Sequence, residues 1–116
     1  MKRLYFLLII LFLISACSGQ EMSFTEQLQK ADTYWTSNKP GKAEKKYAQL
    51  IGSDIVPAEY KSLVYLRLAE AQLQSDKKAD CLNTLDQMSA KLPRIREHHL
   101  LRMDELRLLA NGKTPV

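Results

Sequence analysis

The chain has 116 residues, of which 46% are hydrophobic and 26% are charged, a composition typical of a folded globular protein. This length corresponds to about one domain, which excludes an enzyme with separate cofactor and substrate domains. The 17 basic and 13 acidic residues give a net charge of +4 and are interleaved along the chain, which excludes a protein that binds nucleic acid through a basic block.

The first 16 residues have the pattern of a signal peptide. Lys2 and Arg3 give a positive start, and eleven residues from 4 to 14 form an apolar run that ends in small residues. A membrane-spanning helix needs roughly 20 apolar residues, so this run is too short for one. An uncleaved anchor or a core helix is the alternative, which the lack of a polar face disfavours. Removal of residues 1–16 leaves 15 basic against 13 acidic residues, or +2.

The segment Leu-Ile-Ser-Ala-Cys at residues 13–17 resembles the lipobox of bacterial lipoproteins. The resemblance implies a diacylglyceryl thioether on Cys17, cleavage after Ala16, and often a third acyl chain on the new amino terminus. One chain of myristoyl length binds a membrane only marginally, whereas two or three hold a protein there permanently. Ser18 in place of aspartate implies, by resemblance to sorting in enteric bacteria, the outer membrane facing the periplasm. Residues 17–22 then form a lipidated, small and polar tether.

Five helices are expected after the tether. Ser23 and Glu26 form a capping box that starts the first helix, and the turn residues 38–41 end it. A second helix ends at Gly52, which we expect in the left-handed conformation. A third runs from about Pro57 to about residue 74 and is apolar on more than one face, so we expect it between two neighbours.

A fourth helix stops before Pro93, and a fifth runs from about Ile95 to Ala110 before the stop Asn111-Gly112. No strand pattern competes with these helices, so the expected fold class is all-α. The residues of the fifth helix expected to face inward are Leu100, Met103, Leu106 and Ala110.

An internal repeat runs through these helices. Ala43 and Cys81 occupy matching small positions 38 residues apart, compared with about 34 residues in the tetratricopeptide repeat. The matching positions are Ala31, Tyr34, Ala43, Tyr47 and Leu50 in the first unit, and Tyr65, Leu68, Ala69, Cys81, Leu85, Met88 and Pro93 in the second. This pattern resembles the tetratricopeptide repeat. It implies a short right-handed α-α superhelix of two helix pairs and a capping helix over residues 23–112, with 113–116 as a flexible tail. An ordinary five-helix bundle is the alternative.

The same resemblance implies that the first helix of each pair lines a concave groove that binds a protein or peptide. The positions carried over by spacing are Thr25, Leu28, Asp32, Trp35, Thr36, Leu63, Leu66, Glu70, Leu73 and Gln74, continued by Leu100, Asp104 and Leu108. The main predicted partner-binding residues are Trp35, Asp32, Leu66, Glu70 and Leu73, with Trp35 as the expected hot spot. Their carboxylates favour a partner with apolar anchors and basic flanks. The alternative for Trp35, Leu66 and Leu73 is packing between helices.

The sequence shows no pattern of a catalytic or metal site. His98 and His99 are adjacent and point about 100° apart on a helix, which disfavours a shared metal. Cys81 lies in an apolar stripe and is expected in the core. There is no glycine-rich phosphate loop or nucleophile elbow. We therefore expect no enzyme, cofactor, metal, nucleic acid or small-molecule substrate.

These observations predict a membrane-anchored lipoprotein of the cell envelope that acts as a scaffold for protein binding. Two alternatives remain open at this point. One is a pilotin-like assembly helper for an outer-membrane component. The other is an amino-terminal repeat module of a larger surface polysaccharide-active protein, because residues 112–116 resemble the start of a linker.

Overall fold

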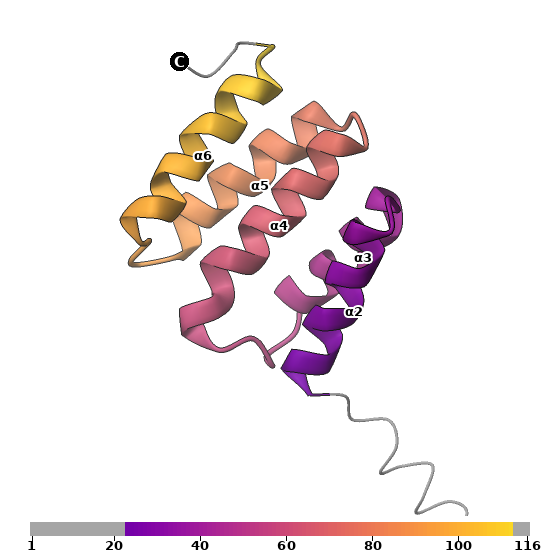
Figure 1. Cartoon of the computed structure of the whole chain (residues 1–116). Coiled ribbons are helices and arrows are strands. Elements are labelled where there is room, and N and C mark those ends of the chain that lie inside the picture. The colour runs from indigo at the N-terminus through magenta and orange to yellow at the C-terminus, as the bar shows by residue number, and fades with distance from the viewer. Residues whose placement is uncertain (1–22, 113–116) are drawn as a thin grey trace, which may run out of the picture.

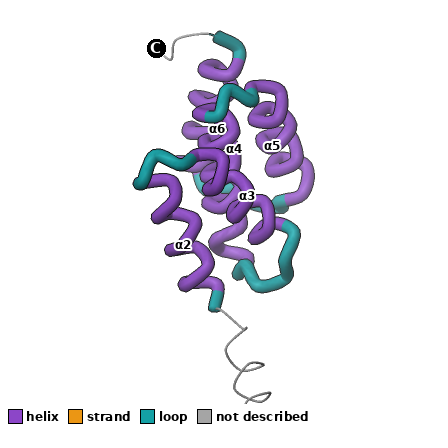
Figure 2. Tube along the Cα trace, turned by 90° about the vertical axis from the view of Figure 1, so that its right-hand side faces the viewer, coloured by secondary structure: helices purple, strands orange, loops and turns teal. Residues whose placement is uncertain are grey.

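The computed structural model describes residues 23–112, and this part of the chain is all-α, as predicted. Its elements are α2 (Phe24–Thr36), α3 (Pro40–Ile51), the short 3-10 helix η1 (Ala58–Tyr60), α4 (Lys61–Gln74), α5 (Lys78–Lys91) and α6 (Glu97–Ala110) (Figure 1). Figure 2 shows helices and loops but no strand in these residues. The helices pack in adjacent pairs, which is compatible with an all-α superhelical fold. The predicted signal peptide, tether, Cys17 and tail lie outside the described residues.

The first helix pair begins as the sequence predicts. The Ser23 hydroxyl accepts a hydrogen bond of 3.3 Å from the backbone N–H of Glu26. The prediction for Gly52 was wrong, because its φ of −78° is right-handed. The reason is that Ser53 donates to the carbonyl of Leu50 from both its backbone N–H and its hydroxyl. The free carbonyl at the end of α3 is therefore satisfied without a left-handed residue.

The turns that follow α2 and α4 have the same geometry. Asn38 and Asp76, which are 38 residues apart, both have a φ of 60°. Asparagine and aspartate tolerate this left-handed conformation better than other residues with a side chain. The next residues, Lys39 and Lys77, donate from the backbone to the carbonyls of Tyr34 and Gln72. The α2–α3 pair and the α4–α5 pair are therefore repeat-like in backbone geometry.

Helix α6 ends in a related turn. Asn111 and Gly112 donate backbone hydrogen bonds to the carbonyls of Arg107 and Leu109, as Ser75 and the residue after it do at the end of α4. Gly112 has a φ of +75°, which a glycine adopts without steric cost. All three helices that open a unit thus end in the same local geometry.

Two apolar clusters hold these helices together, and α4 contributes to both. Small residues at the helix crossings are fully buried, as predicted, because they let the backbones approach closely. The cluster between α2, α3 and α4 contains Ala31, Ala43, Tyr47, Leu50, Val56, Val64, Leu68 and Ala71. The cluster between α4, α5 and α6 contains Tyr65, Leu66, Ala69, Cys81, Leu85, Met88, Met103, Leu106 and Ala110.

The first turn of α6 differs from the prediction. Leu100 was expected inside but is 45% exposed, whereas Met103 and Leu106 are buried. His99 faces α4 instead, with its Nδ1 atom 2.7 Å from the hydroxyl oxygen of Ser62. Since neighbouring residues on a helix point about 100° apart, this contact turns Leu100 out of the interface.

Candidate partner-binding face

The helices α2, α4 and α6 begin at one end of the molecule (Figure 1). The ring of Phe24 at the start of α2 lies 5.4 Å from the ring of Tyr60, which directly precedes α4. The hydrogen bond between Ser62 and His99 joins the first turns of α4 and α6. The first helices of successive units thus bring their side chains to a common face, which is where the sequence placed the groove.

Charged residues cross the α4–α6 side of this face. The Nε atom of Arg102 on α6 donates a 3.0 Å hydrogen bond to Glu70 on α4, and its Nη1 atom donates a 2.7 Å bond to Glu105. Arg67 lies 3.8 Å from the other carboxylate oxygen of Glu70. Burial lowers the pKa of Arg102, but hydrogen bonds to Glu70 and Glu105 outweigh this and raise the pKa above its ordinary value.

The α2 side of the face holds one more carboxylate. The hydroxyl of Tyr47 on α3 donates a hydrogen bond to Asp32. Burial, and then this hydrogen bond, raise the pKa of Tyr47 well above its ordinary value, while Arg67 acts in the opposite direction and Glu70 in the same direction. These electrostatic effects place Asp32, Arg67 and Glu70 around one tyrosine. We call the alternating charges across the face the charged stripe, which consists of Asp32, Arg67, Glu70, Arg102 and Glu105.

The five predicted binding residues have different surroundings. Asp32 and Glu70 lie in the charged stripe. Trp35 and Leu73 are half-buried, each against one of the apolar clusters. Leu66 is only 4% exposed and belongs to the core between α4 and α6, so its predicted contact with a partner is replaced by a structural role.

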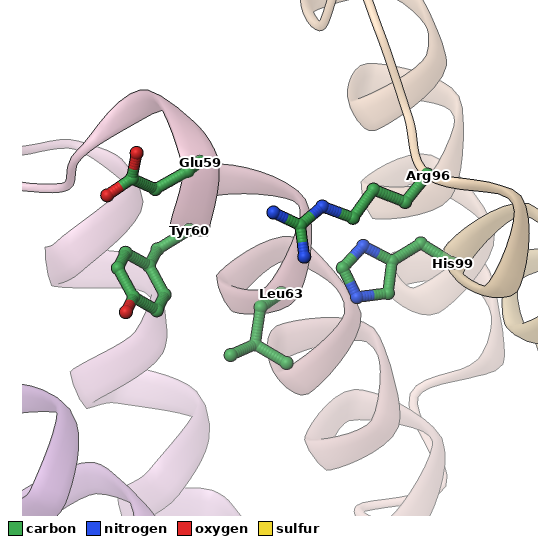
Figure 3. A pocket seen from close by; sticks show the side chains of 5 residues that line it. All are labelled: Glu59, Tyr60, Leu63, Arg96 and His99. Carbon is green, nitrogen blue, oxygen red and sulfur yellow. The ribbon is translucent and has the colours of Figure 1, made fainter.

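A cavity of about 350 Å³ opens at the end of the face where α4 and α6 begin. Glu59, Tyr60, Leu63, Arg96 and His99 line it (Figure 3). Figure 3 shows that Arg96 comes from the loop before α6 and points toward the start of α4. Burial, and then the nearby His98 and Arg96, lower the pKa of His99 below its ordinary value of 6.5. This histidine is therefore predominantly neutral at pH 7.

Sequence reasoning placed Leu63 in the groove but missed Arg96 and His99. The sequence interpretation treated His99 only as a possible metal ligand, and Arg96 looked like one of several interleaved charges. No signal in the chain tells that the loop before α6 folds against η1, because that contact depends on how α6 packs. The two residues acquire a common environment only in the folded protein.

The described residues also bear on catalysis and membrane insertion. Between residues 23 and 112, no group of three or more His, Cys, Asp and Glu side chains could hold a metal ion. Cys81 is fully buried, as predicted, and desolvation raises the pKa of its thiol, which keeps it protonated. None of the helices in this range is long and apolar enough to cross a membrane.

Comparisons with known proteins add no relative. A scan against protein families, a search of curated proteins and a search of solved structures each found no match.

Proposed function

We propose that this protein is a lipid-anchored scaffold that binds another protein through the face formed by α2, α4 and α6. The charged stripe is the observation that supports this most directly, because it joins side chains from the first helix of three successive units. Half-buried Trp35 and exposed Tyr60 lie on the same three-helix layer and offer aromatic anchors. The tetratricopeptide-like pattern and the repeated turn are in keeping with such a role.

The pairing in the charged stripe changes the expected chemistry of the partner. Asp32 and Glu70 alone would favour a basic partner, but Arg67 and Arg102 partly neutralise them. A partner that presents both acidic and basic side chains in complementary order therefore fits best. Such charge order selects a partner and its orientation more than it adds affinity.

The anchor is the second part of the proposal. Seven residues separate Cys17 from Phe24, and a fully extended segment of this length spans at most about 25 Å. With acyl chains on Cys17, the binding face would stay close to the periplasmic surface of the outer membrane. The lipid thus fixes the location, and the face selects the partner.

The binding role can be tested by isolating partners from detergent-solubilised membranes with the tagged full chain. Arg67→Glu reverses a charge inside the stripe, and Lys45→Glu makes the same reversal on the exposed side of α3. We expect the first change to lose one specific partner that wild type and the second retain, at unchanged circular dichroism. Identical partner sets for all three proteins would refute binding through this face.

The anchor is tested separately by mass spectrometry of the amino-terminal peptide. We expect a mass increase on Cys17 that matches a diacylglyceryl group, with or without an amide-linked acyl chain. An unmodified Cys17 in protein purified from membranes would rule out the anchor while leaving the binding face to be judged by the partner experiment.

A further inference from the structure

A second and larger cavity, of about 840 Å³, lies beside the start of α4, between η1 and the link from α5 to α6. Four basic residues line it, Lys61, Lys91, Arg94 and Arg96, against the single carboxylate of Glu59. Two of them lie far from the others in the sequence, and only the fold brings Lys61 beside the α5–α6 link. We call this cavity the basic cavity.

The four cations of the basic cavity have no ion pair with any residue between 23 and 112. The cations elsewhere that do have one are Arg67, Lys77, Arg102 and Arg107. Four unneutralised cations around one concave surface raise the local positive potential, because nearby charges of one sign add and a concave wall focuses their field. The basic cavity is therefore suited to an anionic ligand.

Apolar side chains complete the lining of the basic cavity and its surroundings. Leu92, Pro93 and Ile95 from the α5–α6 link line it. Tyr60 and Ile55, next to and within the segment that leads into α4, are 43% and 41% exposed. Tyrosine and aliphatic residues beside lysine and arginine are typical of a protein surface that rests at a membrane interface.

The position of the basic cavity relative to the anchor gives the direction. α2 begins at the same end of the molecule as α4, since the rings of Phe24 and Tyr60 are in contact. The tether that the sequence predicts would leave from this end. The same end would then face the membrane if Cys17 is acylated, which is the part of the argument that rests on the proposed function.

We propose that the basic cavity binds the phosphate headgroup of an anionic phospholipid. Lys61, Lys91, Arg94 and Arg96 contact the phosphate, and the apolar lining lies against the glycerol and the first methylene groups. Nucleic acid fits less well, because its affinity depends on a long track of phosphate contacts and this cluster is confined to one apolar-lined cavity. The contact orients the helical body on the membrane and leaves the charged stripe accessible.

The experiment measures binding of residues 23–116 to vesicles by flotation. Both apolar clusters lie between Phe24 and Ala110, so this chain keeps every core contact described and carries no acylation site at position 17. Vesicles of phosphatidylcholine alone are compared with an equal mixture of phosphatidylcholine and phosphatidylglycerol. We expect binding to the mixture only, weakened by salt.

A matched pair of double variants locates the contact. Lys91→Gln with Arg94→Gln removes two cations from the basic cavity, and Lys42→Gln with Lys45→Gln removes two from exposed positions on α3. Each lysine or arginine at an anionic surface changes the partition coefficient about fivefold, so we expect a loss of roughly 25-fold for the first pair. The control pair should change it about twofold or less, because its charges lie at the far end of the molecule.

Three results would overturn the proposal. Equal binding to both vesicle types would show that headgroup charge is not read, and an equal loss in both double variants would show dependence on net charge alone. A third is saturation of the same residues by inorganic phosphate in an NMR titration while the mixed vesicles bind no protein. That result would assign the basic cavity to a free phosphate ligand. None of these outcomes depends on Cys17 or on the partner experiment, so this proposal and the proposed function can fail separately.

Discussion

The two helix pairs share one backbone design but use their inner carboxylates differently. Asp32 and Glu70 are 38 residues apart and hold matching positions. In the α2–α3 pair, Tyr47 fills the interior and its hydroxyl donates to Asp32. In the α4–α5 pair, Leu85 takes the tyrosine's position, and Glu70 bonds instead to Arg102 of α6.

This difference shows that a repeated backbone does not imply repeated polar contacts. The carboxylate of the first pair is satisfied within that pair, so it stiffens a terminal unit. The carboxylate of the second pair is satisfied by the next helix, so it ties neighbouring units together. Helix α4 also packs on both sides, which makes the second pair the structural centre of the described residues.

The strongest way to break this centre is to truncate a buried side chain of α4. Leu66→Ala removes a residue that is 4% exposed and should lower the free energy of unfolding by about 2–5 kcal/mol. Leu101→Ala, at a position that is 60% exposed on α6, should change it by about 0.5 kcal/mol or less. Urea denaturation measures both. Equal losses would show that α4 is not the centre of the core.

The carboxylate contact of the first pair is tested by Tyr47→Phe. This change keeps the ring but leaves Asp32 without its buried donor, and hydrogen bonds to charged groups contribute about 1.5–3 kcal/mol. Tyr60→Phe is the control, since the Tyr60 side chain is exposed. If the two variants unfold at the same urea concentration, the Asp32 bond adds nothing to stability.

The link between the second pair and α6 should be weaker, because Arg102 is partly exposed. Arg102→Gln should cost about 1 kcal/mol or less. A double-mutant cycle of Arg102→Gln with Glu70→Gln should show coupling, whereas a cycle with Asp32→Asn should show none. Coupling to Asp32 alone would reverse the assignment of the two carboxylates.

The smallest expected effect is a pH dependence from His99. Its pKa is lower in the folded chain than the ordinary value of 6.5, so the unfolded chain binds a proton more readily. Its contribution to stability is therefore complete above about pH 6.5 and decreases as the pH falls through the folded pKa. Denaturation curves between about pH 7.5 and about pH 5 should show a smaller loss for His99→Gln than for wild type. His98→Gln, which changes an exposed neighbour, should keep most of the wild-type dependence.

The helices could be predicted because their signals are local. Apolar spacing, the cap at Ser23 and the breaks at Pro40 and Pro93 lie within a few residues of the helix ends they define. The small residues at the crossings followed from the repeat pattern, and Ala31 and Ala43 are indeed fully buried.

The candidate site was only partly predictable because it depends on contacts between distant segments. Asp32 and Glu70 were placed on the correct face, but nothing local shows that Arg102 would meet Glu70 from 32 residues away. Leu66 was assigned to the surface because α4 is apolar on several faces, and only the position of α6 decides which face is covered. The basic cavity was missed for the same reason.

The turn at Gly112 has a practical consequence for protein engineering. The equivalent turns at Asn38 and Asp76 each pass the chain directly into a helix that runs back along the preceding one. A designed amphipathic helix fused after residue 112 should therefore be guided onto the outer side of α6. It would shield Leu101 and Leu109 from solvent and lengthen the array by half a repeat.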